Sequence, residues 1–233
     1  MIDLVNIFLN GEYGPILNEF DLKVRTGEVV GLIGRAGGGK SEVLRLASGA
    51  QRPNRGRLRL AGCDVTNHLQ RLREDTALST PDLAGPYNLT VDGWMNYWSS
   101  VRGIRTSDIR QRELKALATF GLLESREKVV HMLSHGQKRC LDLARVWAID
   151  PSIYLLDHPD AFLDGFAFRA LCDAIDKIQE KGKTVILSTT LPNLPRQVCH
   201  KVVHVKHGAV IASKTKGTDQ YKEFIYKAQG WKP

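Results

Sequence analysis

Residues 34–41 read Gly-Arg-Ala-Gly-Gly-Gly-Lys-Ser and follow directly on a largely apolar run at residues 28–33. Glycines in this register let consecutive backbone N–H groups curl around a polyphosphate, while Lys40 reaches its β and γ phosphates and the Ser41 hydroxyl holds Mg²⁺. An ordinary glycine turn requires neither the lysine nor the hydroxyl. The segment therefore predicts a phosphate-binding loop between a strand and a helix, and a nucleotide ligand.

A second apolar run, residues 153–156, ends at Asp157. It predicts a fully buried parallel strand whose carboxyl end delivers one carboxylate to the place where a Mg²⁺ ligand belongs. Ser41 and Asp157 are therefore the expected metal ligands. The residue that follows the strand is His158.

Length and composition limit the class of protein. A chain of 233 residues with 42% apolar content is long enough for one sizeable core, or for one core with an inserted subdomain. No apolar stretch approaches the roughly 18 to 20 residues that span a bilayer, and the first residues lack the layout of a secretion signal. We expect a cytosolic protein.

The net charge and the cysteine spacing say less about the function. The net charge of +8 is spread along the chain, which favours anionic partners without choosing between a nucleotide, membrane headgroups and nucleic acid. The four cysteines have no paired spacing, so neither a zinc site nor a disulfide framework is expected.

The order of elements predicts an α/β fold. Short strand-like runs fill the first third, at residues 2–8, 22–24, 28–33 and 57–60. The pattern then turns helical, with helices expected at residues 91–102, from about 106–108 onward, and at 136–149. A helix ending near Gly182, a strand at 184–187, a hairpin at 202–212 and a helix at about 218–228 follow. This alternation indicates a mostly parallel sheet into which the helical middle is inserted.

The segment Leu133-Ser134-His135-Gly136-Gln137 opens the helix that precedes the metal strand. It closely resembles the signature motif of ATP-binding cassette (ABC) ATPases, which usually reads Leu-Ser-Gly-Gly-Gln. The loop, the signature and the metal strand occur in the order of that family over nearly the whole chain, and two shorter segments, Asp150-Pro151 and Phe162-Leu163-Asp164, also fall where the family places them.

The resemblance implies one ABC-type nucleotide-binding domain over residues 1–233. Its fold is α/β: a P-loop NTPase core with a mostly parallel sheet, an antiparallel β subdomain, and a helical subdomain inserted at about residues 84–150.

The resemblance also implies a head-to-tail dimer in which each ATP lies between the phosphate loop of one subunit and the signature of the other. Ser134 then offers a hydroxyl, and Gly136 the backbone N–H groups of a helix start, to the partner's γ phosphate. Tyr13 matches the aromatic residue that stacks on adenine, with a packed surface aromatic as the alternative. Asp164 matches a loop that crosses to the partner. The expected nucleotide contacts are Tyr13, Gly34, Arg35, Gly37, Gly38, Gly39, Lys40, Ser41, Glu42, Ser134, Gly136 and Gln137.

Three positions depart from the family's pattern. His158 stands where the family has the glutamate that polarises the attacking water, and Thr190 stands where it has a histidine. The family's coupling glutamine is also absent, with Asp82 as the nearest polar stand-in. A general base contributes about 10²- to 10⁴-fold in rate, so hydrolysis in the chain's own pocket should be very slow. Two alternatives remain: His158 acts as a weak base, or Asp160 reaches the water.

These features favour the ATP-binding subunit of a membrane transporter, peripheral on the cytoplasmic face. Its expected partners are transmembrane permease subunits and a second nucleotide-binding subunit, whose site the intact Ser134 and Gly136 would complete. Trp94 and Trp98, one helical turn apart, are more typical of subdomain core than of a contact with the membrane subunit. The alternatives are a non-hydrolytic, ATP-gated homodimeric clamp and a soluble cassette protein acting on ribosomes or nucleic acid. The last usually carries a second cassette or a long helical insertion, so no nucleic-acid partner is expected.

Overall fold

A computed structural model describes residues 1–104 and 108–231 of the chain. Its centre is a six-stranded sheet in the order β10-β9-β3-β8-β7-β6. The five strands from β9 to β6 run parallel, and only the edge strand β10 is antiparallel to its neighbour. The mostly parallel sheet expected from the sequence is thus confirmed. The strands are β3 (Val29–Ile33), β6 (Thr76–Ser79), β7 (Ile153–Asp157), β8 (Thr184–Thr189), β9 (Lys201–Lys206) and β10 (Ala209–Thr215).

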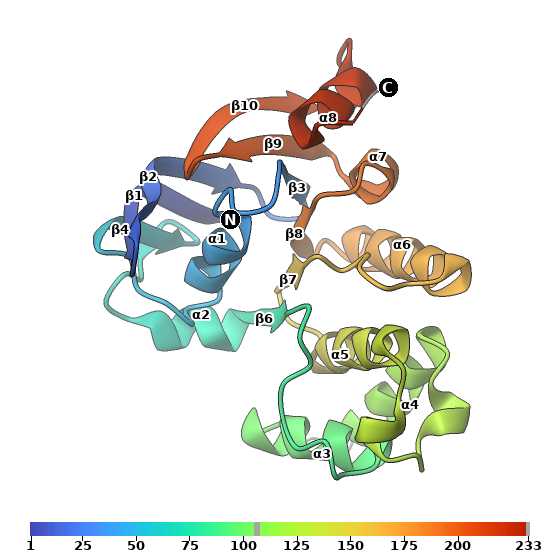
Figure 1. The fold of residues 1–233 in the computed structure, drawn as a ribbon. Helices are drawn as coiled ribbons and strands as arrows, with labels where there is room; N and C mark the ends of the chain where they lie inside the picture. The colour runs from blue at the N-terminus through green and yellow to red at the C-terminus, as the bar shows by residue number, and fades with distance from the viewer. Residues whose placement is uncertain (105–107, 232–233) are drawn as a thin grey trace.

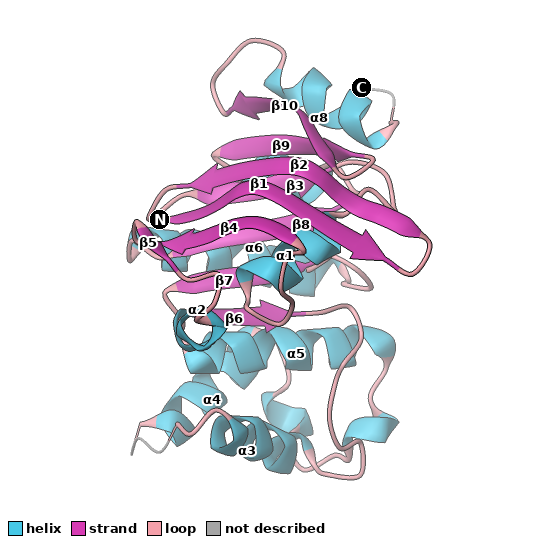
Figure 2. Cartoon of the chain, turned by 90° about the vertical axis from the view of Figure 1, so that its left-hand side faces the viewer, coloured by secondary structure: helices cyan, strands magenta, loops and turns pink. Residues whose placement is uncertain are grey.

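A second sheet, antiparallel and in the order β2-β1-β4-β5, lies across the first (Figure 2). It is built on a long hairpin, and it confirms the expected antiparallel subdomain. Its strands are β1 (Ile2–Gly11), β2 (Gly14–Val24), β4 (Arg55–Leu60) and β5 (Cys63–Asp64).

Helices pack against the six-stranded sheet, and others form a separate group at the bottom of Figure 1. The α-helices are α1 (Lys40–Ala47), α2 (Leu69–Asp75), α3 (Val91–Val101), α4 (Ile109–Thr119), α5 (His135–Ile149), α6 (Gly165–Glu180), α7 (Asn193–Val198) and α8 (Tyr221–Gln229), and two short 3₁₀ turns are η1 (Leu123–Ser125) and η2 (Val130–Met132). None of the helices in the described part of the chain is long and apolar enough to cross a membrane.

The central strands are buried on both faces, which explains their continuous apolar runs. Along β7, Leu155 packs into the cluster formed with α1, α2 and the antiparallel sheet, whereas Leu156 packs into the cluster formed with α5 to α8. Alternating residues therefore serve two cores. The carboxyl ends of β3, β7 and β8 meet at one edge, where Ile33 is in register with Thr189, and Asp157 with Ser188.

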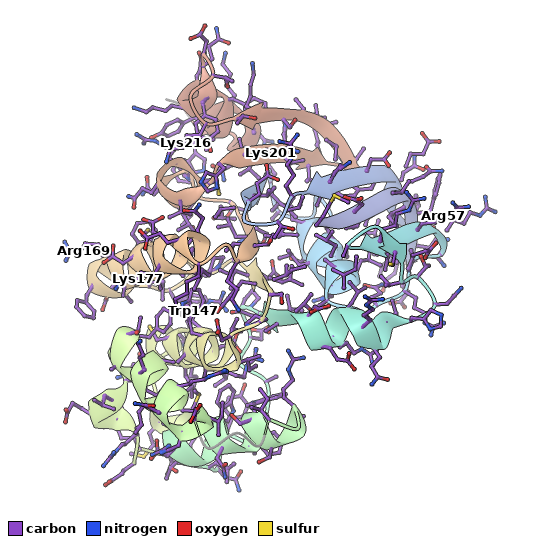
Figure 3. The ribbon with its side chains drawn as sticks, turned by 180° about the vertical axis from the view of Figure 1, so that it is seen from behind. Arg57, Trp147, Arg169, Lys177, Lys201 and Lys216 are labelled. Carbon is purple, nitrogen blue, oxygen red and sulfur yellow. The ribbon has the colours of Figure 1, made fainter. Side chains whose placement is uncertain are left out.

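The helical group is joined to the sheet through α5. The Trp147 ring of α5 lies 5.2 Å from the ring of Phe120 and 5.1 Å from that of Tyr154 on β7, and Figure 3 shows Trp147 between the two parts. Trp94 is fully buried and its ring contacts Trp98 edge-on at 5.9 Å. The tryptophan pair therefore belongs to the core of the helical group.

Several elements differ from the sequence expectation. The first two strands are longer than the expected runs. The sequence pattern did not show their full length because bulges with positive φ, at residues such as Asn6 and Glu19, interrupt the alternation of apolar and polar residues. The last helix begins at Tyr221, not near residue 218. Helix α4 begins after Asp108, while the expected cap residues Thr106 and Ser107 lie outside the described residues. Strand β6 and helices α2 and α7 were not predicted.

Candidate nucleotide-binding site

The phosphate loop connects β3 to α1, and two neighbouring strands fix its shape. A Cβ on Gly34, whose φ is +142°, would lie 2.2 Å from the Val205 carbonyl oxygen of β9. A Cβ on Gly39, whose φ is +95°, would lie 2.7 Å from Leu17 of β2. Only glycine fits at these positions. Gly37 is exposed and faces open space. The loop therefore packs on β2 and β9 at Gly34 and Gly39 and is open to solvent at Gly37.

Lys40 is the buried cation of the loop. Its Nζ donates hydrogen bonds to the carbonyl oxygens of Gly34 at 3.0 Å and Arg35 at 2.7 Å. Burial lowers its pKa, while Asp157 and Glu42 act in the opposite direction. An ammonium group has three donors, so one N–H remains for an anion in front of the loop.

Ser41, Asp157 and Ser188 lie together at the edge where β7 and β8 end. The Ser41 hydroxyl donates to Asp157 Oδ1 at 3.0 Å, and the Ser188 hydroxyl donates to the same oxygen at 2.5 Å. One carboxylate with two hydroxyls suits Mg²⁺, which takes few protein ligands and completes its shell with phosphates and water. The described residues contain no group of three acidic, histidine or cysteine side chains that could hold a metal alone. Ser188 was missed in the sequence because only the pairing of β7 with β8 brings it beside Asp157.

His158 follows the metal strand in a left-handed conformation, with φ of 45°. Its amide donates to both the carbonyl oxygen and the hydroxyl of Ser188, each at 3.1 Å. Burial lowers the pKa of the imidazole, with Asp157 opposing and Lys40 reinforcing this shift. The side chain is therefore neutral at pH 7 and carries no carboxylate-like charge.

Asp160 is buried, and its Oδ2 accepts a hydrogen bond from the Thr189 hydroxyl at 2.7 Å. Burial raises its pKa. The same hydroxyl accepts from the Leu191 amide at 2.9 Å, so this carboxylate is engaged in holding the loop that follows β8. Thr190 is half-buried in that loop, and Asp82 is exposed beyond β6.

The signature residues start helix α5. Ser134 caps the helix, accepting from the Gln137 amide at 3.2 Å while the Gln137 side chain accepts from the Ser134 amide at 3.0 Å. The Ser134 hydroxyl keeps its own hydrogen for another acceptor. A Cβ on Gly136 would lie 2.8 Å from the Phe162 carbonyl oxygen, and the exposed His135 ring lies 5.9 Å from the Phe162 ring. The signature therefore contacts residues around Phe162, and within the described residues no hydrogen bond joins it to the chain's own phosphate loop.

Tyr13 occupies the tip of the β1–β2 hairpin and is 96% exposed, so it is not a packed surface aromatic. The hairpin leads back to the loop, because a Cβ on Gly39 would lie 3.3 Å from the Ile16 carbonyl oxygen. Glu42 lies in the first turn of α1 and pairs with Arg45 at 3.8 Å. Arg35 is exposed, and its guanidinium lies against Gly230 after α8.

Arg139 is a buried cation that sequence reasoning missed. Its guanidinium, 2% exposed, donates to the carbonyl oxygens of Asp157 at 2.8 Å and Thr80 at 2.5 Å. Asp142 lies 3.5 Å away and also accepts from the Thr80 amide and from Arg145. Helix α5 is thereby fixed to the carboxyl ends of β6 and β7.

Known proteins share both the sequence pattern and the fold. A family model described as ABC transporter matches residues 17–161. A putative ABC transporter ATP-binding protein of Nostoc is 34% identical over 185 residues, covering 77% of this chain and 67% of that protein. A methionine import ATP-binding protein of Rhodopseudomonas palustris is 30% identical over 203 residues and 85% of this chain, which spans about half, 54%, of that protein.

Solved structures agree on the fold. A dimeric ATP-binding cassette in a post-hydrolysis state with ADP and Pi superposes with a TM-score of 0.84 at 24% identity, covering 92% of this chain and 98% of that one. The expected α/β P-loop NTPase fold is confirmed.

Proposed function

The chain belongs to the ABC transporter family, and from that premise we propose that it is the ATP-binding subunit of a membrane transporter. The observation that carries the proposal is the convergence of Lys40, Ser41 and Asp157 at the edge where β3, β7 and β8 end. A nucleoside triphosphate with Mg²⁺ requires three features that this site combines: a phosphate loop packed on neighbouring strands, one free lysine N–H, and a carboxylate with two hydroxyls.

In this proposal the exposed front of the loop, around Gly37, cradles the phosphates, and Lys40 binds the β and γ phosphates. Ser41 and Asp157, assisted by Ser188, hold Mg²⁺, which when bound neutralises phosphate charge. Tyr13 is free to stack on adenine because no part of the described chain covers its ring. Arg35, Gly34, Gly38, Gly39 and Glu42 complete the cradle.

Hydrolysis in this pocket should be slow. His158 is neutral and its backbone is fixed by Ser188, so it offers no carboxylate to the attacking water. The alternative base, Asp160, is occupied by Thr189. Thr190 and Asp82 take the places of the remaining catalytic side chains and supply neither an imidazole nor an amide.

The signature serves a second nucleotide-binding subunit. Ser134, Gly136 and Gln137 form an exposed helix start with a free hydroxyl hydrogen, which suits the γ phosphate of a nucleotide on another chain. In this proposal residues 1–233 form one nucleotide-binding domain, with a helical subdomain at about 84–150. It works on the cytoplasmic face of a membrane with permease subunits and without nucleic acid.

A second candidate is a non-hydrolytic homodimeric clamp, which the neutral, immobilised His158 favours. Purifying the chain from its native membrane and identifying the bound proteins distinguishes the two. A permease with a second cassette carrying the glutamate and the histidine supports the transporter. Recovery of copies of this chain alone supports the clamp.

The direct test of the site is Mg-ATP binding measured beside phosphate release. We expect tight binding with slow turnover, and loss of binding in Lys40→Ala because the free N–H for the phosphates is removed. Lys177→Ala, at an exposed position of α6, is the matched control. Fast turnover by the purified chain alone would contradict the impaired pocket.

A further inference from the structure

The end of helix α8 contacts two separate parts of the nucleotide site. In Figure 1 this helix lies at the top of the molecule, near β9 and α7. It is anchored there by the Tyr221 hydroxyl, which donates to the Cys199 carbonyl oxygen at 2.9 Å, and by Arg196, which donates to the Tyr226 hydroxyl at 2.5 Å. Ile225 is fully buried in the core beneath. The helix therefore holds its last residues in a fixed place.

The first contact is with the loop that follows β8. Gln229 Nε2 donates to the carbonyl oxygens of Thr189 at 3.3 Å and Leu191 at 3.1 Å. The Trp231 indole N–H donates to the Thr190 carbonyl oxygen at 3.2 Å. Three consecutive carbonyl groups are thus bound by two side chains from the end of α8.

Packing alone does not explain why a glutamine occupies position 229. The side chain is 7% exposed, and its Oε1 has no hydrogen-bond partner among the described residues. A buried amide oxygen without a partner costs stability, so an apolar residue of similar size would pack more favourably. The two bonds that its nitrogen donates to the loop account for an amide at this position.

The second contact is with the phosphate loop. Gly230 ends α8 in the left-handed region, with φ of +79°, and a Cβ on it would lie 3.1 Å from both Nε and Nη2 of Arg35. The guanidinium therefore rests on the carboxyl end of the helix, where the backbone dipole favours a cation. Any side chain at 230 would displace it.

The two loops that the end of α8 contacts begin side by side. Thr189 ends β8 in register with Ile33, the last residue before the phosphate loop, and Ser188 touches Asp157. In the proposed function, a nucleotide seated on residues 34–41 has its outermost phosphate at this edge, beside Asp157 and the loop at 189–191, whose backbone the end of α8 holds.

We propose that residues 229–231, here named the α8 clasp, position the loop at 189–191 against the terminal phosphate and so make this site prefer ATP over ADP. The inference rests on the proposed nucleotide binding. Gln229 and Trp231 are positioning residues, since they act through the loop backbone and touch no phosphate.

The test compares ATP and ADP affinity, each with Mg²⁺, in the full chain and in Gln229→Ala and Trp231→Phe. The second variant keeps the ring and removes the donor. We expect ATP affinity to fall about tenfold in each, and ADP affinity to stay within about twofold, because ADP lacks the phosphate that the loop faces. Lys222→Ala, exposed on the same helix, should change neither.

Unchanged affinity for both nucleotides would overturn the clasp. Equal losses for ATP and ADP would also overturn it, because they would mean that the end of α8 supports the fold of the site without discriminating the terminal phosphate. If the unaltered chain binds neither nucleotide, the proposed function itself fails, and this result is distinct from both of the others.

Discussion

His158 combines a left-handed backbone with an amide bonded twice to Ser188, so its Cα is fixed directly after the metal carboxylate. If the missing carboxylate limits hydrolysis, His158→Glu should raise turnover in this pocket by about tenfold or more, about 1.4 kcal/mol of barrier. Recovery should stay partial, because Thr190 supplies no imidazole. The rate of phosphate release by the purified chain, compared between the variant and the unaltered protein, measures the gain in turnover.

His158→Gln is the control for that substitution, since it matches glutamate in size without its charge. A gain in the glutamine variant, or none in the glutamate variant, would show that some other feature of the pocket limits the reaction.

Two half-buried histidines predict a pH dependence of stability: His158, and His204 of β9, whose ring would lie 3.5 Å from a Cβ on Gly34. Burial lowers the pKa of both His158 and His204, so the unfolded chain binds more protons than the folded one at pH values below about 6.5. The free energy of unfolding should be highest above that pH and should fall as the pH decreases through it. Denaturant unfolding at pH 7.5 and 5.5 measures the loss.

The loss should be smaller in His158→Gln and in His204→Gln, because each variant removes one group that must be protonated on unfolding. His131→Gln, at an exposed position, should leave the loss unchanged. Equal pH dependence in all of the variants would contradict the assignment.

At the scale of elements, α5 combines the signature with the anchor to the metal strand. Arg139→Met should lower the free energy of unfolding by roughly 3 to 5 kcal/mol, because it leaves the Asp157 and Thr80 carbonyl groups without their donor and removes one of the two cations beside the buried Asp142. Urea unfolding measures the change. Lys138→Met, the adjacent half-exposed residue, should cost far less, and a similar loss in both variants would argue against the anchor.

At the scale of the proposed assembly with a second nucleotide-binding subunit, the two motifs should act on different nucleotides. Ser134→Arg places bulk where the partner's γ phosphate is expected, so it should suppress the ATPase activity of the complex severely. His158→Ala should barely lower it if, as proposed, His158 does not act as the base in that pocket. Steady-state hydrolysis by the two mutant complexes measures the contrast. A larger loss in His158→Ala would make this histidine catalytic.

The phosphate loop, the apolar strand that ends at Asp157 and the signature could be predicted from the sequence, because the residue types that mark each of them are consecutive, and their order along the chain pointed to the family. Residues 34–41 carry their own glycines, and Ser134 and Gln137 cap their own helix. The boundaries of strands β1 and β2 could not be predicted from the sequence, because bulges at Asn6 and Glu19 interrupt the alternation of apolar and polar residues that marks a strand.

Only the tertiary structure decided which distant residues complete the site. Ser188 reaches Asp157 through strand register, Arg139 reaches it through the packing of α5, and Gln229 meets Thr189 because α8 folds back over the sheet. These contacts join residues 18 to 40 positions apart, and no local pattern encodes them. They arise because parallel strands bring their carboxyl ends to one edge, where side chains from every connecting element converge.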